Sequence, residues 1–157
     1  MPEMWQIIKE VRRVKCKFMD NLAKLMLSGE SSSYNEHFKQ KFELIGKKAM
    51  KELAMLLELK EYDISFNPGG IAVSGDLSLM GMWEEGNGVY VTMNKDFPGQ
   101  AYGDFYFRSI KDMKDFTGGT NCWMRFALLR FPDAIRERIF TLRRWHENEK
   151  ERFQLRA

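Results

Sequence analysis

Hydrophobic residues near the start of the chain recur every three or four positions, which is the spacing of amphipathic helices. The first series comprises Ile7, Val11, Val14, Phe18, Leu22 and Leu25. It predicts a helix over residues 3–27, and the serine-rich stretch that follows predicts a loop. A second series predicts a helix from Ser33, which fits a capping box with Glu36, to about Leu59. The short polar connection favours an antiparallel helical hairpin.

From Tyr62 onward, apolar and polar residues alternate with period two, which is typical of β-strands. Residues rich in glycine, proline and asparagine interrupt the alternation and predict turns. The predicted strands cover residues 62–66, 71–79, 89–93 and 102–108. Because the connections are too short for helical crossovers, these strands predict an antiparallel meander.

The last part of the chain returns to helical patterns. Asn121 is the predicted N-cap of a short helix that holds Trp123 and Phe126, and Pro132 begins a longer C-terminal helix. We therefore predict an α+β fold, in which the N-terminal helical hairpin and the C-terminal helix pack on a four-stranded antiparallel sheet. We expect one domain over residues 1–157, composed of the hairpin (1–60), the sheet (61–110) and the C-terminal helices (121–157).

Composition limits the class of protein. The chain has 157 residues, of which 44% are hydrophobic and 30% charged, as expected for one domain with a buried core. Its longest apolar run, residues 53–57, is far shorter than the roughly 20 residues of a membrane span, and its first residues predict no signal peptide. Two distant cysteines, Cys16 and Cys122, and two histidines predict neither a disulfide scaffold nor a metal site. We expect a cytoplasmic protein without metal, cofactor or membrane contact.

The net charge of +3 conceals a division along the chain. Residues 61–121 hold four basic and nine acidic side chains, whereas residues 122–157 hold nine basic and five acidic ones. This division predicts a basic surface at the ends of the chain and an acidic surface in its middle, as in proteins that steer a partner electrostatically. The alternative is that long helices simply carry Lys and Arg on their solvent-exposed faces.

A glycine-rich connection before the last helices is the first candidate site. Its members are Asp115, Thr117, Gly118, Gly119, Asn121, Trp123 and Arg125. Two glycines beside hydroxyl groups at a helix start expose backbone N–H groups that hold a phosphate or a carboxylate. Neither GxxxxGK[ST] nor GxGxxG is present, so the known nucleotide-binding loops are not supported. In the alternative interpretation, the two glycines only allow the chain to turn.

The C-terminal helix carries the second candidate site, a basic surface. Its members are Arg136, Arg143, Arg144, Trp145 and Lys150. In one interpretation this helix binds a polyanion or an acidic protein surface, and on a phosphate backbone arginine would make bidentate contacts and tryptophan would offer a stacking surface. Intervening glutamates favour the alternative of a solvated helix face with ion pairs. No carboxylates stand out as a pair in contrasting environments, so the sequence leans against an enzyme.

The sheet region and the glycine turn resemble small uncharacterised proteins carried by phages and plasmids. The likeness covers residues 62–131, and its most specific part is Lys114-Asp115-Phe116-Thr117-Gly118-Gly119-Thr120-Asn121-Cys122-Trp123. It implies a bacterial host cell invaded by a mobile element, and it implies no activity. Small phage proteins without catalytic motifs often inhibit host defences, and anti-CRISPR proteins are one kind.

The leading hypothesis is a non-enzymatic binding module that inhibits a host protein or nucleoprotein complex. One alternative is a direct nucleic-acid-binding protein that uses the basic terminal helices. Another is a small enzyme, or a binder of a phosphorylated ligand, at the Gly118-Gly119 turn. The sequence leaves the partner and the oligomeric state open.

Overall fold

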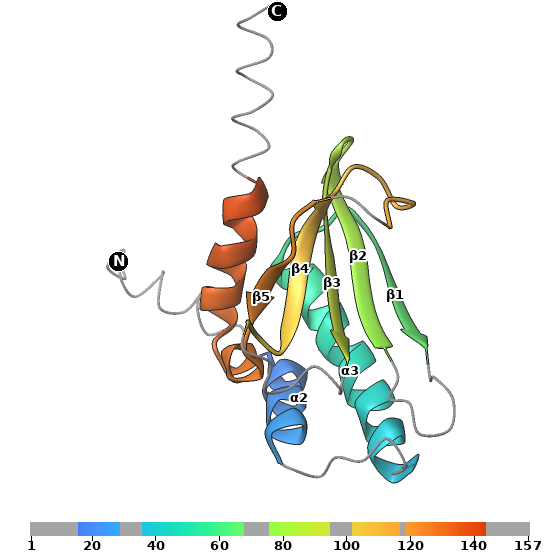
Figure 1. Cartoon of the computed structure of the whole chain (residues 1–157), viewed down its shortest axis with the longest axis vertical. Helices are drawn as coiled ribbons and strands as arrows, with labels where there is room; N and C mark the ends of the chain where they lie inside the picture. The colour runs from blue at the N-terminus through green and yellow to red at the C-terminus, as the bar shows by residue number, and fades with distance from the viewer. Residues whose placement is uncertain (1–15, 29–35, 68–75, 95–101, 117–118, 144–157) are drawn as a thin grey trace, which may run out of the picture.

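The computed structural model describes residues 16–28, 36–67, 76–94, 102–116 and 119–143 (Figure 1). It has the α+β class that the sequence predicts. The elements are α2 (Lys17–Leu27), α3 (Glu36–Leu56), β1 (Glu61–Asn67), β2 (Asp76–Glu84), β3 (Asn87–Asn94), β4 (Phe105–Ile110), β5 (Cys122–Met124) and the 3-10 helix η1 (Phe126–Arg130). Residues 132–143 form a further helix, close to the predicted start at Pro132.

The sheet is an antiparallel meander in the order β1-β2-β3-β4-β5. The predicted strands 62–66, 89–93 and 102–108 correspond to β1, β3 and β4, with small shifts at their ends. β2 continues beyond the predicted residue 79 to Glu84, because the alternation of inward side chains continues as far as Trp83. Residues 71–75 of that prediction lie outside the described residues. The turn into β3 is therefore only Glu85-Gly86.

The prediction of four strands, and of a short helix around Trp123, is wrong. Cys122–Met124 forms a fifth strand that pairs with β4, and helical backbone begins only at Phe126. Pairing satisfies backbone groups at the edge of β4 and places Met124 in the hydrophobic core. These long-range contacts outweigh the local N-cap signal of Asn121.

The two N-terminal helices form the predicted antiparallel hairpin. The backbone N–H of Met19, near the start of α2, donates to Glu52 Oε1, near the end of α3 (2.8 Å). α3 ends at Leu56 rather than at the predicted Leu59, because Glu58 takes a positive φ of 57°, a conformation that ends helices. Residues 3–15 and Ser33, where the two predicted helices begin, lie outside the described residues.

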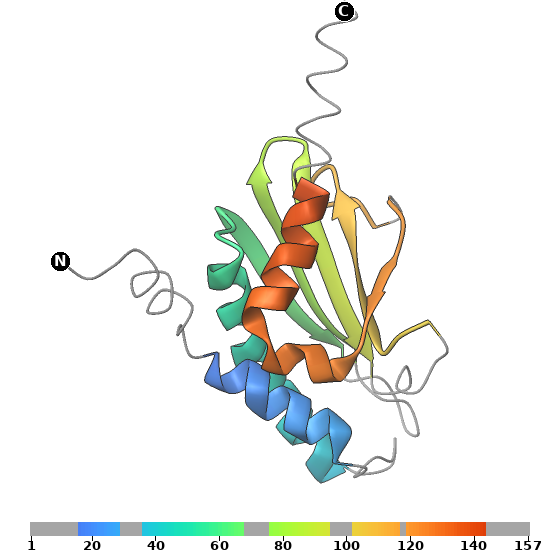
Figure 2. The same ribbon diagram turned by 90° about the vertical axis from the view of Figure 1, so that its left-hand side faces the viewer.

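All the described helices lie on one face of the sheet (Figure 2). Phe42 of α3 is fully buried against this face, whereas Phe18 of α2 is only partly buried. A Cβ atom on Gly46 would lie 2.6 Å from Leu77 Cδ2, so this glycine lets α3 approach β2 closely. The buried Trp83 indole donates to the Leu57 carbonyl (2.7 Å), which fixes the end of α3 to the sheet. No helix in the described ranges is long and apolar enough to span a bilayer.

Candidate binding site

The face of the sheet that the described helices leave uncovered carries aromatic and polar side chains. Directly opposed residues of neighbouring strands point to the same side. The strand register aligns Ser78, Thr92, Tyr106 and Trp123 in one row across β2 to β5. Their neighbours Met124, Phe105 and Phe107 point to the opposite side, into the core.

Three aromatic rings cluster at the β4–β5 side of this face. The Trp123 ring centroid lies 4.3 Å from that of Tyr102 and 4.9 Å from that of Tyr106. Tyr102 is 59% exposed, and Tyr106 and Trp123 are partly buried. Tyr90 of β3 lies in the next cross-strand row, opposite Arg108. We call Tyr90, Tyr102, Tyr106 and Trp123 the aromatic face.

Polar contacts tie the aromatic face to the middle of the sheet. Ser78 Oγ is within hydrogen-bond distance of the Tyr90 hydroxyl (3.2 Å) and of Thr92 Oγ1 (3.1 Å). The Arg108 guanidinium lies over the Tyr90 ring, 4.7 Å from its centroid. Burial raises the pKa of Tyr106, and the neighbouring Tyr90 raises it further. Its phenol is therefore protonated at neutral pH and able to donate a hydrogen bond.

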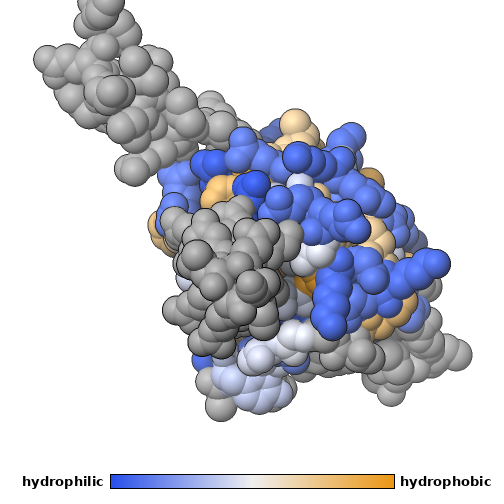
Figure 3. Space-filling view, turned by 90° about the horizontal axis from the view of Figure 1, so that it is seen from above, coloured by the Kyte–Doolittle hydropathy of each residue, from blue (hydrophilic) through white to orange (hydrophobic). Residues whose placement is uncertain are grey.

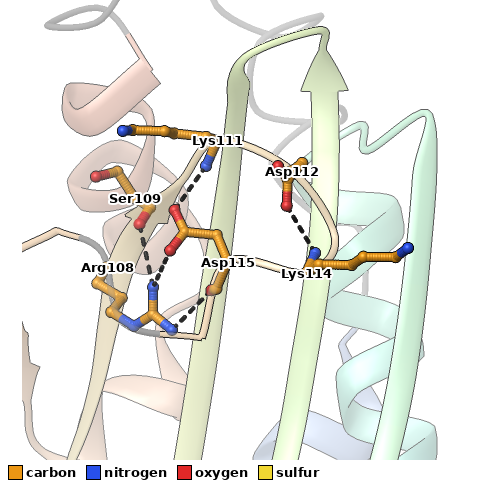
Figure 4. A network of polar contacts seen from close by, with 6 residues as sticks. All are labelled: Arg108, Ser109, Lys111, Asp112, Lys114 and Asp115. Atoms are coloured by element: carbon orange, nitrogen blue, oxygen red, sulfur yellow. Dashed lines mark hydrogen bonds and ion pairs between the residues drawn. The ribbon is translucent and has the colours of Figure 1, made fainter.

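Arg108 also holds the segment that follows β4 (Figure 4). Its Nη2 donates to the Asp115 carbonyl (3.0 Å), and its Nη1 lies 4.0 Å from the Asp115 carboxylate. That carboxylate accepts the backbone N–H of Lys111 (3.0 Å), and Asp112 Oδ1 accepts the N–H of Lys114 (2.8 Å). Together these contacts close residues 111–115 into a compact loop, which we call the Arg108 loop.

The structure separates several members of the predicted glycine-turn site. Asp115 belongs to the Arg108 loop, and Trp123 belongs to the aromatic face. Arg125 lies beyond β5, with its Nη1 3.5 Å from Asp104 Oδ1. Asn121 is exposed, and Thr117 and Gly118 lie outside the described residues.

Gly119 has a clear structural requirement. It takes a φ of 79°, and a Cβ atom there would lie 2.8 Å from the backbone oxygen of Ser109 in β4. The alternative in which the glycine allows the chain to turn thus has a physical basis at this residue. Anion or partner binding by the turn stays a prediction.

Two members of the predicted basic surface contact the body of the protein. The Arg136 guanidinium lies 4.8 Å from the Phe140 ring centroid, and its Nη2 lies 3.2 Å from Glu58 Oε2. The Arg143 guanidinium lies 5.6 Å from the Trp83 ring centroid. Arg144, Trp145 and Lys150 lie outside the described residues, so the role of this surface in nucleic-acid binding stays a prediction.

Exposed charge on the sheet region is predominantly acidic. Among the described residues between 61 and 116, the exposed basic side chains are Lys111 and Lys114. The exposed carboxylates are Glu61, Asp63, Asp76, Glu84, Glu85 and Asp112. Glu61 and Asp63 of β1 lie opposite Met82 and Met80, and therefore on the same face as the aromatic residues. Sequence charge predicts this acidic surface. The register places its β1 part, Glu61 and Asp63, on the same side of the sheet as Tyr90, with Met80 and Met82 of β2 between them. We call Glu61 and Asp63 the acidic border.

A pocket of about 460 Å³ opens at the end of the sheet where the β2–β3 turn meets the Arg108 loop. Figure 3 looks down on this end of the molecule, where hydrophilic residues surround small hydrophobic patches. The pocket is lined by Lys60, Glu61, Met82, Trp83, Glu84, Glu85, Gly86, Lys111, Asp112 and Met113. The described residues contain no group of three or more His, Cys, Asp and Glu side chains placed to hold a metal ion.

Sequence reasoning missed Tyr90, Tyr102, Tyr106 and Arg108 as candidate site residues. The alternation within each strand assigns Tyr90 and Tyr106 to one side of the sheet, but only the cross-strand register brings them beside Trp123. Comparisons of the chain with protein-family models, curated proteins and solved structures found no match.

Proposed function

We propose that this protein is a non-enzymatic binding module of a phage or other mobile element. In this proposal it inhibits a host protein or nucleoprotein complex by covering a basic surface of that partner. The bacterial setting comes from the resemblance of the sheet region and glycine turn to small phage and plasmid proteins. The anti-defence role comes from the general tendency of small phage proteins without catalytic motifs to inhibit host defences. The contact surface that we assign is the aromatic face together with its acidic border.

The observation that carries the proposal is the ring cluster of Tyr102, Tyr106 and Trp123. Tyrosine and tryptophan are enriched in protein interfaces, where they bury a large area and still offer a polar group. Tyr102 leaves 59% of its surface exposed and lies against Trp123, so a partner can cover two adjoining rings. An exposed ring held by a neighbouring ring also loses little conformational entropy on binding.

The charge on the β1 side of this face favours a protein partner over a nucleic acid. Glu61 and Asp63 lie on the same face as the aromatic residues, and phosphate groups would be repelled there. A nucleic-acid-binding face normally carries an excess of Lys and Arg. Basic side chains on a partner protein would complement the carboxylates and accelerate association.

Capture from a bacterial lysate, with and without nuclease treatment, tests the proposal. The bait proteins are the wild type, Tyr102→Ala on the aromatic face, and Met55→Ala on α3, whose side chain is also exposed (69%). We expect Met55→Ala to retain the partner and Tyr102→Ala to weaken its binding about tenfold or more, as for an interface hot spot. Melting temperatures of all three proteins control for unfolding.

Two results would contradict the proposal. Equal capture by all three proteins would remove the aromatic face from the interface. Capture of nucleic acid without any accompanying protein, lost on nuclease treatment, would instead support the nucleic-acid alternative and its basic terminal helices.

A further inference from the structure

We propose that the pocket at the end of the sheet binds a basic peptide segment of the partner, with a Lys or Arg side chain inserted. This inference rests on the proposed function and assigns a chemical class to one contact of the partner. The pocket adjoins the acidic border of the aromatic face, because Glu61 contributes to both. A partner that covers that border with basic residues can therefore reach the pocket.

The charges that line the pocket select a cation. Four carboxylates, those of Glu61, Glu84, Glu85 and Asp112, outnumber the two ammonium groups of Lys60 and Lys111. An incoming anion would meet net repulsion, whereas an ammonium or guanidinium group gains Coulomb attraction and carboxylate acceptors. Guanidinium groups fit best, since they pair with carboxylates through two parallel hydrogen bonds.

The apolar lining suits the stem of such a side chain. Met82 and Met113 line the pocket and belong to the small hydrophobic cluster on the helix-free face. Lys and Arg commonly pack their methylene groups on apolar surface while the charged group stays among polar groups. Methionine adapts its shape to such contacts. The volume of about 460 Å³ admits one basic side chain with its neighbouring residues.

The Arg108 loop forms one wall of the pocket without help from a ligand. Asp115 contacts both Arg108 and the N–H of Lys111, and Asp112 accepts the N–H of Lys114. These hydrogen bonds fix the backbone on both sides of Met113. A wall that is already ordered loses less entropy when a ligand binds.

Titration of the isolated protein with a nona-arginine peptide, followed by amide NMR shifts at two salt concentrations, tests the pocket. A nona-glutamate peptide serves as the opposite-charge probe. The pocket variant combines Glu61→Gln with Glu85→Gln. The control variant combines Glu36→Gln with Glu137→Gln, two exposed positions on the helices, which removes the same charge outside both the pocket lining and the acidic border.

We expect nona-arginine to shift the amides of Glu61, Gly86, Lys111 and Met113. The pocket variant should bind it about tenfold more weakly than wild type, and the control variant within about twofold. Equal weakening in both variants would show general charge attraction and overturn the pocket assignment. Absence of arginine binding at low salt, or binding of nona-glutamate at these amides, would also overturn it. None of these results involves the captured partner, so failure here is distinct from failure of the aromatic face.

Discussion

At the scale of single residues, a comparison of Gly119 with Gly86 distinguishes the cost of a left-handed backbone from the cost of a steric clash. They have nearly equal φ values, 79° and 78°, but a Cβ atom would meet Ser109 only at Gly119 and would meet open space at Gly86. We expect Gly86→Ala to cost about 1 kcal/mol of unfolding free energy from its left-handed backbone. Gly119→Ala should cost at least about 2 kcal/mol, because overpacking adds to the strain.

Urea unfolding of the two alanine variants measures this difference, and equal costs would contradict the close contact with Ser109. A substitution at the exposed Asn121 tests whether the glycine turn also binds the partner. Asn121→Ala is expected to leave stability unchanged, so a loss of partner capture in this variant would assign the glycine turn to the binding surface.

The thiol of Cys16 is expected to make the unfolding free energy fall at high pH. Burial, followed by the charges of Glu52 and Asp133, raises the pKa of its thiol from 9.0 to about 11. The unfolded chain therefore releases this proton at lower pH than the folded protein. The stabilising contribution of the buried thiol is fully present below pH 9 and is lost as the pH rises through 11.

Urea unfolding between these pH values tests the prediction. The wild type should lose more unfolding free energy than Cys16→Ala, which lacks the thiol and shares every other titrating group. A parallel pH dependence of the two proteins would contradict a raised thiol pKa in the folded state.

At the scale of elements, the two phenylalanines of the helical hairpin, Phe18 and Phe42, are buried to different extents. Phe42 is fully buried, so Phe42→Ala should cost about 3–5 kcal/mol. Phe18 is partly buried, with Lys48 Nζ 5.0 Å from its ring centroid, and Phe18→Ala should cost about 1–2 kcal/mol. Denaturant midpoints of both variants measure the costs, and the reverse order would mean that the hairpin packs differently.

The spacing of hydrophobic residues in the sequence predicts those helices and strands that bury one continuous row of apolar side chains. The three-and-four spacing around Phe42 and the alternation around Val91 place α3 and β3 correctly, because each series has one buried side. β5 has only three residues and exists because the edge of β4 accepts it. A strand that depends on a distant partner leaves little periodicity for sequence reasoning to detect.

At the scale of the whole molecule, the sheet has two unlike faces. One packs against the described helices in a single hydrophobic core. The other combines the aromatic face, the acidic border and the pocket. Charge segregation indicates the acidic surface from sequence alone, but the aromatic face depends on a register across several strands. Register is a property of the assembled sheet, so the candidate site emerges only with the structure.

Hydrogen–deuterium exchange of the protein, alone and bound to its captured partner, tests the central claim most directly. If the partner covers the aromatic face, exchange should slow at amides of β4, β5 and Tyr102, while α3 keeps the exchange rates of the free protein. Slower exchange confined to α3 or to the helix over residues 132–143 would place the partner on the opposite side of the molecule and contradict the proposed binding face.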